Sequence, residues 1–400
     1  MVTTRADPPA RLLDLTRLVS RAGRPFTGID RVEYAYLREL SRTGPLFGLV
    51  RSSLGYLLLD QRGCAELKRR IDAADWPEPD LLARLRRLDP GRAGAERALR
   101  SVALARCLPS GLGRVLHRHL PAGTHYLNTG HTNVTERSIA ALRALPESRI
   151  AVLLHDTLPL DFPEHQAPGI PERFSGMLTR IGRHADLVIC NSQQTEHDLR
   201  RHLPDSPAAS VVAHLGIDLP EPTQPPQGPW QGRPYFVALG TIEPRKNHAL
   251  LLDIWERDPP DAELLICGSR GWNNAEVFAR LDAGIPRVHE LPGLSDGQVA
   301  ALLKGSAGLL FPSLAEGYGL PPIEAAALGV PVLASNLSVL REVLGDIPVY
   351  APVTERYLWT QSIKTMAEDR RAGRGEAPGA AEAFAPPGWE AHFKTVLTLI

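Results

Sequence analysis

The feature that most constrains the fold is a twice-repeated alternation of short apolar runs with segments of helical periodicity. In the first half, the apolar runs that end in polar or glycine residues are 11–15, 125–130, 149–156, 186–192 and 210–218. In the second half, the corresponding runs are 235–240, 263–269, 288–292, 308–313, 331–335 and 347–352. Alternating strands and helices are typical of parallel sheets covered by helices. The sequence therefore predicts two α/β domains.

A segment rich in Pro and Gly, EPTQPPQGPWQG (221–232), separates the two halves. Neither helix nor strand persists in such a composition, so this segment is the predicted linker. We predict an N-terminal domain over 1–220, a C-terminal domain over 233–385 and a final helix over 386–400. Within the first domain, residues 60–120 fit the alternation least well and form a predicted helical, arginine-rich insertion.

The last helix of this insertion carries Leu108, Leu112, Val115 and Leu116 on one side. An amphipathic helix of this kind either covers the core of its own domain or lies on a membrane. We favour the core, because most amphipathic helices pack inward.

The charge balance excludes one class of partner and leaves another open. Lys plus Arg and Asp plus Glu both number 45, so no overall field attracts nucleic acid. The first 120 residues are nevertheless basic. A basic half suits an anionic membrane surface or an acidic substrate, and it also suits a solvated arginine-rich face.

The cysteines and the amino-terminal residues indicate a cellular compartment. The chain has four cysteines, Cys64, Cys107, Cys190 and Cys267, without a CxxC pair. Free thiols inside apolar runs behave as small hydrophobes, which fits a reducing cytosol. The first residues lack the apolar region of a secretory signal, and no apolar run reaches about 18 residues. We expect a cytoplasmic protein, soluble or peripheral at the inner face of the plasma membrane.

The most informative stretch is FPSLAEGYGLPPIEAAALGVPVLAS (311–335), which holds two carboxylates beside a predicted helix start. Gly317 and Gly319 allow a ligand to approach the backbone, and the free N–H groups of the helix start favour phosphate. Glu316 and Glu324 are suited to accept hydrogen bonds from sugar hydroxyls on either side of that phosphate. A sugar nucleotide has this layout. The alternative is two acids that stabilise the positive end of a helix.

A second cluster favours the phosphate interpretation. In LGTIEPRKNHALLL (239–252), Arg245 and Lys246 come directly after a predicted strand and before a helix that starts at Asn247. Phosphate binders occur at the carboxyl edge of parallel sheets. Cations at a helix start oppose the helix dipole, so a purely structural role explains them poorly.

These motifs resemble the retaining glycosyltransferases of family 4. The two glutamates in EGYGLPPIEAAALGVPV are similar to the E-x7-E signature of that family, and GTIEPRKN resembles its phosphate-binding segment. The further matching segments are TGIDRVEYAYLREL, LLHDTLPLDFPE (153–164), NSQQTEHDL (191–199), HLGID (214–218) and ICGSRGWN (266–273). The matches run from about residue 12 to residue 352. The resemblance implies the GT-B fold, with two Rossmann-like domains whose parallel sheets face a central cleft.

The resemblance also implies roles for residues of the C-terminal domain. Arg245 and Lys246 would neutralise the diphosphate of a nucleotide-sugar donor. Glu324 would hold the ribose hydroxyls, and Glu316 those of the transferred sugar. The backbone near Gly319 and Leu320 would contact sugar or phosphate.

Four further residues complete the predicted site. Gly28 corresponds to a glycine that approaches the diphosphate, although this chain has Thr27–Gly28 where the family often has two glycines. Gly240 ends a strand beside the donor. His155 corresponds to a histidine near the transferred sugar, and Asp156 could orient the acceptor hydroxyl. A structural role at the strand end is the alternative for the His155–Asp156 pair.

The expected chemistry is glycosyl transfer, in which negative charge grows on the leaving diphosphate. Fixed positive charge and N–H dipoles aimed at that diphosphate should contribute most. The predicted catalytic residues are His155, Asp156, Arg245, Lys246 and Glu316. Two carboxylates also serve hydrolytic glycosidases, but cations beside Glu316 suit donor binding better. No D-x-D motif is present, and the resemblance implies no cofactor and no essential metal. The resemblance also implies that the configuration of the transferred sugar is retained, through attack of the acceptor on the same face that the diphosphate leaves.

The segments PRKN, GSRGWN and HDTLPLDFPE are similar to bacterial mannosyl- and rhamnosyltransferases that build O-antigen or exopolysaccharide. We therefore expect a GDP- or UDP-sugar donor, with GDP-mannose as the first choice. The acceptor is expected to be a glycan or an undecaprenyl-diphosphate-linked glycan. Two alternatives stay open: a sugar-nucleotide epimerase of the same fold, and a non-catalytic partner that binds sugar nucleotides. A change in the stereochemistry of free UDP-N-acetylglucosamine in the absence of an acceptor would indicate the epimerase.

Overall fold

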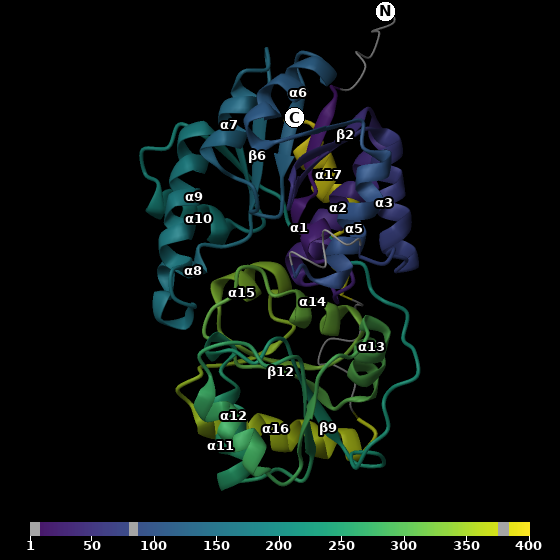
Figure 1. The fold of residues 1–400 in the computed structure, drawn as a ribbon. Helices are drawn as coiled ribbons and strands as arrows, with labels where there is room; N and C mark the ends of the chain where they lie inside the picture. The colour runs from purple at the N-terminus through teal and green to yellow at the C-terminus, as the bar shows by residue number, and fades with distance from the viewer. Residues whose placement is uncertain (1–8, 80–86, 375–383) are drawn as a thin grey trace, which may run out of the picture.

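The computed structural model describes residues 9–79, 87–374 and 384–400. Each half of the described chain builds one sheet with helices on both faces, and the two halves are stacked end to end (Figure 1). The two α/β units predicted from the alternation are therefore present.

The first sheet has eight strands over the described residues, in the order β4-β3-β2-β1-β5-β6-β7-β8. Strands β1, β2 and β5 to β8 are parallel, as predicted, with Leu12 of β1 opposite Phe47 of β2. One edge of this sheet differs from the predicted parallel arrangement, because β3 pairs antiparallel with β2, and β4 pairs antiparallel with β3. The strands are β1 (Arg11–Asp14), β2 (Leu46–Ser52), β3 (Gly55–Leu59), β4 (Ala105–Cys107), β5 (His125–Asn128), β6 (Arg149–Leu154), β7 (Leu187–Cys190) and β8 (Ala209–Val212).

The second sheet has six strands over the described residues, all parallel, in the order β11-β10-β9-β12-β13-β14. Every residue of its inner strands β10 and β12 is buried. Strands buried on both faces read as continuous apolar runs, which is why the sequence located them. The strands are β9 (Tyr235–Leu239), β10 (Glu263–Cys267), β11 (Val288–Leu291), β12 (Gly308–Phe311), β13 (Val332–Ser335) and β14 (Val349–Ala351).

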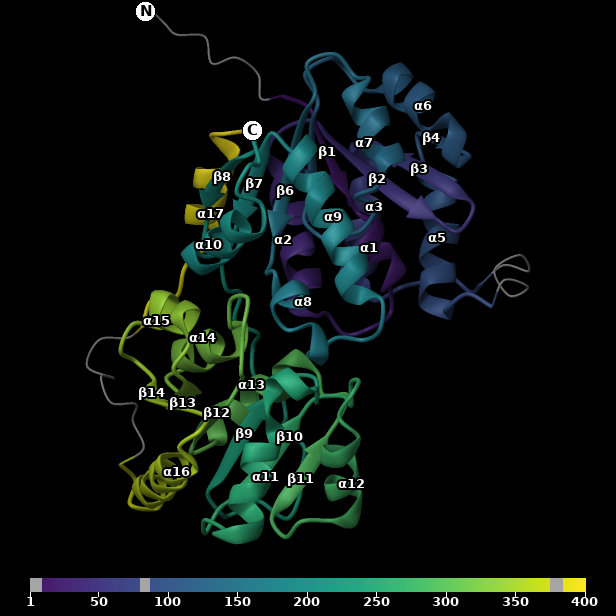
Figure 2. The same ribbon diagram turned by 90° about the vertical axis from the view of Figure 1, so that its left-hand side faces the viewer.

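Helices cover both faces of each sheet (Figure 2). In the first half they are α1 (Thr16–Ser20), α2 (Gly28–Thr43), α3 (Gln61–Ala73), α5 (Pro90–Val102), α6 (Leu112–His119), α7 (Glu136–Arg143), α8 (Leu158–Asp161), α9 (Ile170–His184) and α10 (Gln193–His202), with 3-10 turns at Pro109–Gly111 and Pro163–His165. Later come a 3-10 turn at Pro244–Lys246, then α11 (His248–Arg257), α12 (Ala275–Ala283), α13 (Asp296–Gly305), α14 (Leu320–Ala327), α15 (Ser338–Leu344), α16 (Arg356–Arg371) and α17 (Trp389–Leu397).

The arginine-rich region 60–120 is less purely helical than the sequence suggested. It contains α3, α5 and α6, but strand β4 extends the edge of the sheet between them. Residues 80–86 of the predicted insertion lie outside the described residues. Leu112 and Leu116 of α6 are buried against the first domain, whereas Leu108 is 69% exposed. The helix thus covers the domain's own core.

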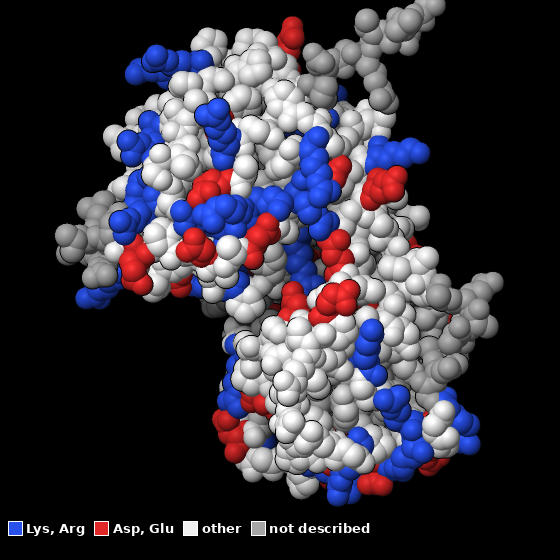
Figure 3. Space-filling view, turned by 90° about the vertical axis from the view of Figure 1, so that its right-hand side faces the viewer, with Lys and Arg blue, Asp and Glu red and all other residues white. Residues whose placement is uncertain are grey.

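Basic and acidic side chains are mixed over the face that carries α3 and α5 (Figure 3). On α3, Lys68 pairs with Asp72, and Arg69 and Arg70 pair with Glu66. Local ion pairing therefore accounts for much of the arginine-rich composition of this helix.

The last helix, α17, returns to the first domain. His392 Nε2 lies 2.8 Å from the hydroxyl of Tyr36 on α2, and the Phe393 ring lies 4.9 Å from the Tyr36 ring. His392, Phe393 and Tyr36 are all buried. The chain therefore passes from one domain to the other twice.

Two further observations concern cysteines and membranes. The four cysteines are free thiols, and burial raises the pKa of Cys190 and of Cys267 to about 12. Across the described residues, no helix combines the length and the apolar character needed to span a bilayer.

Candidate functional site

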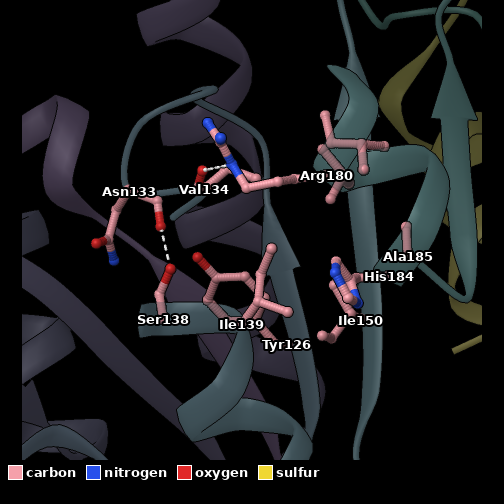
Figure 4. A pocket seen from close by; sticks show the side chains of 11 residues that line it. Tyr126, Asn133, Val134, Ser138, Ile139, Ile150, Arg180, His184 and Ala185 are labelled. Carbon is pink, nitrogen blue, oxygen red and sulfur yellow. Dashed lines mark hydrogen bonds between the residues drawn. The ribbon is translucent and has the colours of Figure 1, made fainter. Parts of the chain in front are cut away.

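A large cleft lies between the two sheets, with a volume of about 1710 Å³. Its walls contain all ten residues that the sequence selected, namely Gly28, His155, Asp156, Gly240, Arg245, Lys246, Glu316, Gly319, Leu320 and Glu324. A much smaller space inside the first domain, between α7 and α9, has about 10 Å³ and is lined mainly by apolar side chains (Figure 4). It has room for about one water molecule. The cleft is therefore the candidate site.

Two loops at the carboxyl edge of the second sheet form one wall of the cleft. One follows β9 and carries Arg245 and Lys246; the other follows its sheet neighbour β12 and carries Glu316. The loops are joined because the Leu314 N–H donates to the Arg245 carbonyl at 2.8 Å, and an Arg245 Nη1–H donates to the Ala315 carbonyl at 2.7 Å. The phosphate-binding and sugar-binding candidates are thus parts of one rigid unit.

Glu316 holds both predicted cations. Its Oε1 lies 2.6 Å from Lys246 Nζ and 2.8 Å from Arg245 Nη1. Burial alone would raise the pKa of Glu316, but the charges of Arg245 and Lys246 outweigh it and lower this pKa to about 2. Burial lowers the pKa of Lys246, while Glu316 opposes that shift. With Glu243 also 2.6 Å from Arg245, two carboxylates and two cations share the site, and these ion pairs hold both cations in position at the cleft.

The glycines in the loop before α14 are required by close contacts. A Cβ on Gly317 would lie 2.6 Å from the His155 carbonyl oxygen and 2.8 Å from Asp156 Cβ. Gly319 has φ +92°, and a Cβ there would lie 2.4 Å from Leu340. At Gly317 this loop therefore runs against the N-terminal domain, and at Gly319 it packs on α15 of its own domain.

Helices from both domains begin at the cleft. Gly28 is the first residue of α2, whose start is closed by a capping box between Thr27 and Asp30. A Cβ on Gly28 would lie 3.0 Å from Leu320, the first residue of α14. Two helix N-termini thus face the same space, where their N–H groups favour anions.

Glu324, the predicted ribose ligand, is buried on α14 and contacts the other domain. Its Oε1 lies 2.6 Å from Arg31 Nη1, and Arg31 Nη2 lies 2.8 Å from Asp296. Burial raises the pKa of Glu324, and Arg31 opposes this shift. The carboxylate that should meet the ribose is therefore held in place by an arginine from across the cleft.

His155 and Asp156 directly follow β6 on the N-terminal wall. His155 is 6% exposed, and its Nε2 lies 2.7 Å from the Thr129 carbonyl oxygen. Burial, with a contribution from His131, lowers the pKa of His155 well below its usual range, which favours a neutral ring. Burial raises the pKa of Asp156 to about 6, partly offset by Arg245. A carboxylate that can take up a proton near pH 6 thus faces the Gly317 loop of the opposite wall.

Several cleft residues were missed by sequence reasoning. Arg31 lies one turn after Gly28 in the same TGIDR segment, so its position in that motif was an available signal. His131 follows β5, and its ring lies 4.9 Å from that of His155. Trp272 Nε1–H donates to the His165 carbonyl across the cleft at 2.8 Å. These last two contacts join distant segments and have no sequence pattern.

Comparison with known proteins agrees with this geometry. Residues 221–349 match the family described as "Glycosyl transferases group 1". The serotype-specific mannosyltransferase WbdA of Escherichia coli is 33% identical over 231 residues, which cover 52% of this chain and 27% of WbdA. The O-antigen chain mannosyltransferase B of Escherichia coli is 34% identical over 128 residues, 30% of this chain and 33% of that protein. The chain thus spans about a quarter to a third of the length of these curated relatives.

Solved structures match over nearly the full length. HepE of Anabaena, crystallised with UDP and glucose, gives a TM-score of 0.66 at 16% identity and covers 98% of this chain and 99% of its own. Sucrose-phosphate synthase from Thermosynechococcus elongatus gives a TM-score of 0.65 at 16% identity, with 98% of each chain covered. WaaG, a glycosyltransferase involved in lipopolysaccharide biosynthesis, gives 0.57 at 13% identity, with 91% of this chain and 92% of WaaG covered.

The fold predicted from the sequence is therefore confirmed. The matched region contains Arg245, Lys246, Glu316 and Glu324, the residues on which the resemblance was based. The chain has the GT-B fold, and residues 221–349 of its second half match the glycosyl transferases group 1 family.

Proposed function

We propose that the protein is a glycosyltransferase that moves a sugar from a nucleotide-sugar donor to a glycan acceptor. The observation that carries this proposal is the cluster of Arg245, Lys246 and Glu316 at the cleft, beside the start of α14. Positive charge and helix N–H groups suit a diphosphate, and a carboxylate suits the sugar hydroxyls.

The residues divide the work of the reaction between them. Arg245 and Lys246 would stabilise the negative charge that develops on the leaving diphosphate. Glu316 would exchange part of its pairing with these cations for the hydroxyls of the transferred sugar. Glu324 would hold the ribose through its Oε2, since Arg31 occupies Oε1. Two fixed cations supply the needed charge, so the proposal includes no metal ion and no cofactor.

The N-terminal wall would receive the acceptor. Asp156 would orient or deprotonate a hydroxyl of the acceptor. Its closeness to Gly317, in the loop that follows Glu316, supports this role. We propose retention of configuration by front-face attack, as the family 4 resemblance implies. His155, which is neutral, would then contact the transferred sugar without adding charge.

The donor and acceptor are proposed from the relatives. Their names, mannosyltransferase WbdA and O-antigen chain mannosyltransferase B, favour mannose from GDP-mannose. The UDP bound in HepE makes a UDP-sugar the second choice. The acceptor would be a glycan of a cell-surface polysaccharide, free or linked to undecaprenyl diphosphate. The protein would then act in the cytoplasm, at the inner face of the membrane.

A thermal-shift panel of nucleotides and sugar nucleotides tests this proposal first, because a ligand that binds the folded state raises the melting temperature. We expect GDP or UDP, and one matching sugar nucleotide, to stabilise the protein. Transfer is then measured with radiolabelled donor and oligomannoside acceptors. Absence of stabilisation by every nucleotide would refute the proposal. Binding without transfer would favour the non-catalytic alternative, and epimerisation of the free donor would favour the epimerase.

A further inference from the structure

We propose that Arg17 and Arg21, on the N-terminal wall of the cleft, form an anion subsite for a phosphate-type group of the acceptor. This inference rests on the proposed glycosyl transfer and concerns the class of acceptor. Both arginines line the cleft, and their side chains are 21% and 28% exposed. Neither belongs to the donor cluster on the opposite domain.

A single buried carboxylate holds both arginines. Asp30 is 1% exposed, and its two oxygens lie 2.7 Å from Arg17 Nε and 2.8 Å from Arg21 Nε. Arg17 Nη2–H also donates to the Thr27 hydroxyl at 3.1 Å, and Arg21 Nη2–H to the Pro25 carbonyl at 3.3 Å. Among the described residues, the Nη1 group of each arginine has no partner. Two guanidinium groups are thus fixed in position with donors left for a ligand.

Neighbouring acids leave the positive charge uncompensated. Glu33, beneath Arg17, accepts a hydrogen bond from the Leu18 N–H at 3.0 Å and is fully buried. Burial raises the pKa of Glu33 well above its usual range, which favours its neutral form. Asp30 therefore supplies one negative charge against two positive charges. An arginine fork of this kind matches the geometry of phosphate oxygens.

The arginine pair lies close to the reaction centre. The Arg17 stem packs on Gly130, where an added Cβ would lie 3.0 Å from Arg17 Cβ. The next residue, His131, contacts the His155 ring. Burial, and to a smaller extent the charge of Arg17, lower the pKa of His131 to about 4. An anion bound at Arg17 would thus be a near neighbour of the predicted acceptor hydroxyl.

A third arginine flanks the same loop from α9. Arg180 lines the cleft, and its Nε–H donates to the Val134 carbonyl at 3.0 Å (Figure 4). No ion pair involves Arg180 within the part of the chain that the structure describes. The loop 129–135 therefore has arginines on two sides, and an anion bound beside it would meet positive charge from both.

The test separates this subsite from the donor site. Wild-type protein, Arg17→Met, Arg21→Met and the exposed surface control Arg62→Met are first titrated with the nucleoside diphosphate that stabilises the wild type. Each protein, saturated with that nucleotide, is then titrated calorimetrically with mannose 1-phosphate, geranyl diphosphate and neutral methyl mannoside. Arg17→Lys, which keeps the charge, is included in case a methionine variant fails to fold.

We expect both methionine variants to bind the nucleotide within about twofold of the wild type. Their affinity for at least one phosphate probe should fall about tenfold or more, as for loss of a charge-assisted hydrogen bond. Arg62→Met should match the wild type. Arg17→Lys, which keeps the charge but loses the guanidinium fork, should bind the probe more weakly than the wild type and more tightly than Arg17→Met. A response to geranyl diphosphate alone indicates a lipid-linked diphosphate, and a response to mannose 1-phosphate indicates a sugar phosphate.

Two results would overturn the inference. If the methionine variants weaken nucleotide binding as strongly as Lys246→Ala does, the arginines belong to the donor site. If the nucleotide-loaded wild type binds no phosphate probe, or the variants bind it as well as the wild type, there is no subsite. Failure of the proposed function is recognised earlier, because no nucleotide would then bind in the first titration.

Discussion

Glu316 determines the electrostatics of the cleft at the level of single residues. Its carboxylate stays ionised despite burial because Arg245 and Lys246 both lie within 2.8 Å. Without a ligand, this pairing lowers the cost of keeping two buried cations side by side. When a diphosphate enters, it can take over the cations and leave the carboxylate available for hydroxyl groups.

The first prediction concerns Lys246. Lys246→Ala should lower turnover, and affinity for the donor, by about tenfold or more, since it removes a fixed charge from the leaving group. The protein should remain folded, because Arg245 still neutralises Glu316. Initial rates at varied donor concentration check this, with the exposed Lys304→Ala as control. Rates near those of the wild type would place the diphosphate elsewhere.

The second prediction concerns the pH dependence contributed by Asp156. Its pKa is about 6 in the folded protein, mainly because of burial, and about 4 in an unfolded chain. Between these values the folded state binds the extra proton, so the contribution of Asp156 to stability falls as pH rises through this window. The substitution Asp156→Asn removes this pH-dependent loss of stability, because asparagine does not ionise. Its melting temperature relative to the wild type should therefore be higher at pH 7 than at pH 4.

The control is Asp205→Asn, which shows how removal of an exposed carboxylate changes the melting temperature over the same pH range. Melting curves at several pH values between 4 and 7 provide the measurement. A difference between Asp156→Asn and the wild type that stays constant, or shrinks with rising pH, would contradict the shifted carboxyl.

Among the elements, the loop between β12 and α14 connects the chemistry to the domain interface. It carries Glu316 and then passes within van der Waals distance of the β6 end, at His155 and Asp156. Only a residue without a side chain fits there. The loop thus fixes the distance between Glu316 and Asp156, the carboxylates proposed to contact the donor and the acceptor.

The third prediction tests this fit. Gly317→Ala places a Cβ 2.6 Å from the His155 carbonyl oxygen, so the loop and the β6 end must move apart. Overpacking of this kind costs about 1–3 kcal/mol, and transfer should fall more than nucleotide binding. Gly388→Ala is the matched control, because a Cβ there meets nothing within 4 Å. Equal effects of the two substitutions on transfer would show that the contact is unimportant.

The elements also show what the sequence could and could not predict. Apolar runs and turn residues were enough to predict strands such as β10 and β12 and the start of α14 after Gly319. The hairpin of β2 and β3 was missed because all of β3 is buried. A continuous apolar run of this length does not distinguish strand from helix. Site residues within single motifs were found, whereas the Arg31–Glu324 pair joins residues 293 positions apart, and no local pattern reveals it.

For the molecule as a whole, ion pairs across the cleft join the two domains beside the proposed donor site. Arg31 of the first domain reaches both Glu324 and Asp296 of the second. Behind the cleft, Glu342 of α15 accepts hydrogen bonds from the Gln193 N–H at 2.7 Å and from His214 at 2.8 Å. The domains are thus held together by charges on two sides.

The fourth prediction follows from the Arg31 contacts. Arg31→Met should weaken nucleotide binding a few-fold, in line with about 1 kcal/mol for a part-exposed ion pair, and should increase the radius of gyration of the nucleotide-free protein. Small-angle scattering and calorimetry provide the two measurements. Arg38→Met, which removes the pair with Asp218 at 2.8 Å, serves as control. An unchanged radius together with unchanged affinity would show that Arg31 does not join the domains.

The return of α17 to the first domain has a consequence for dissection of the protein. A fragment that ends at the linker 221–232 would lack His392 and Phe393, and would leave the Tyr36 ring facing water. Sequence order and structural unit therefore do not coincide, and a separable N-terminal half would require residues 384–400 to be joined to it by a new peptide connection. Because the chain connects the two domains at two places, the domains can move relative to each other only by rotation about these two connections.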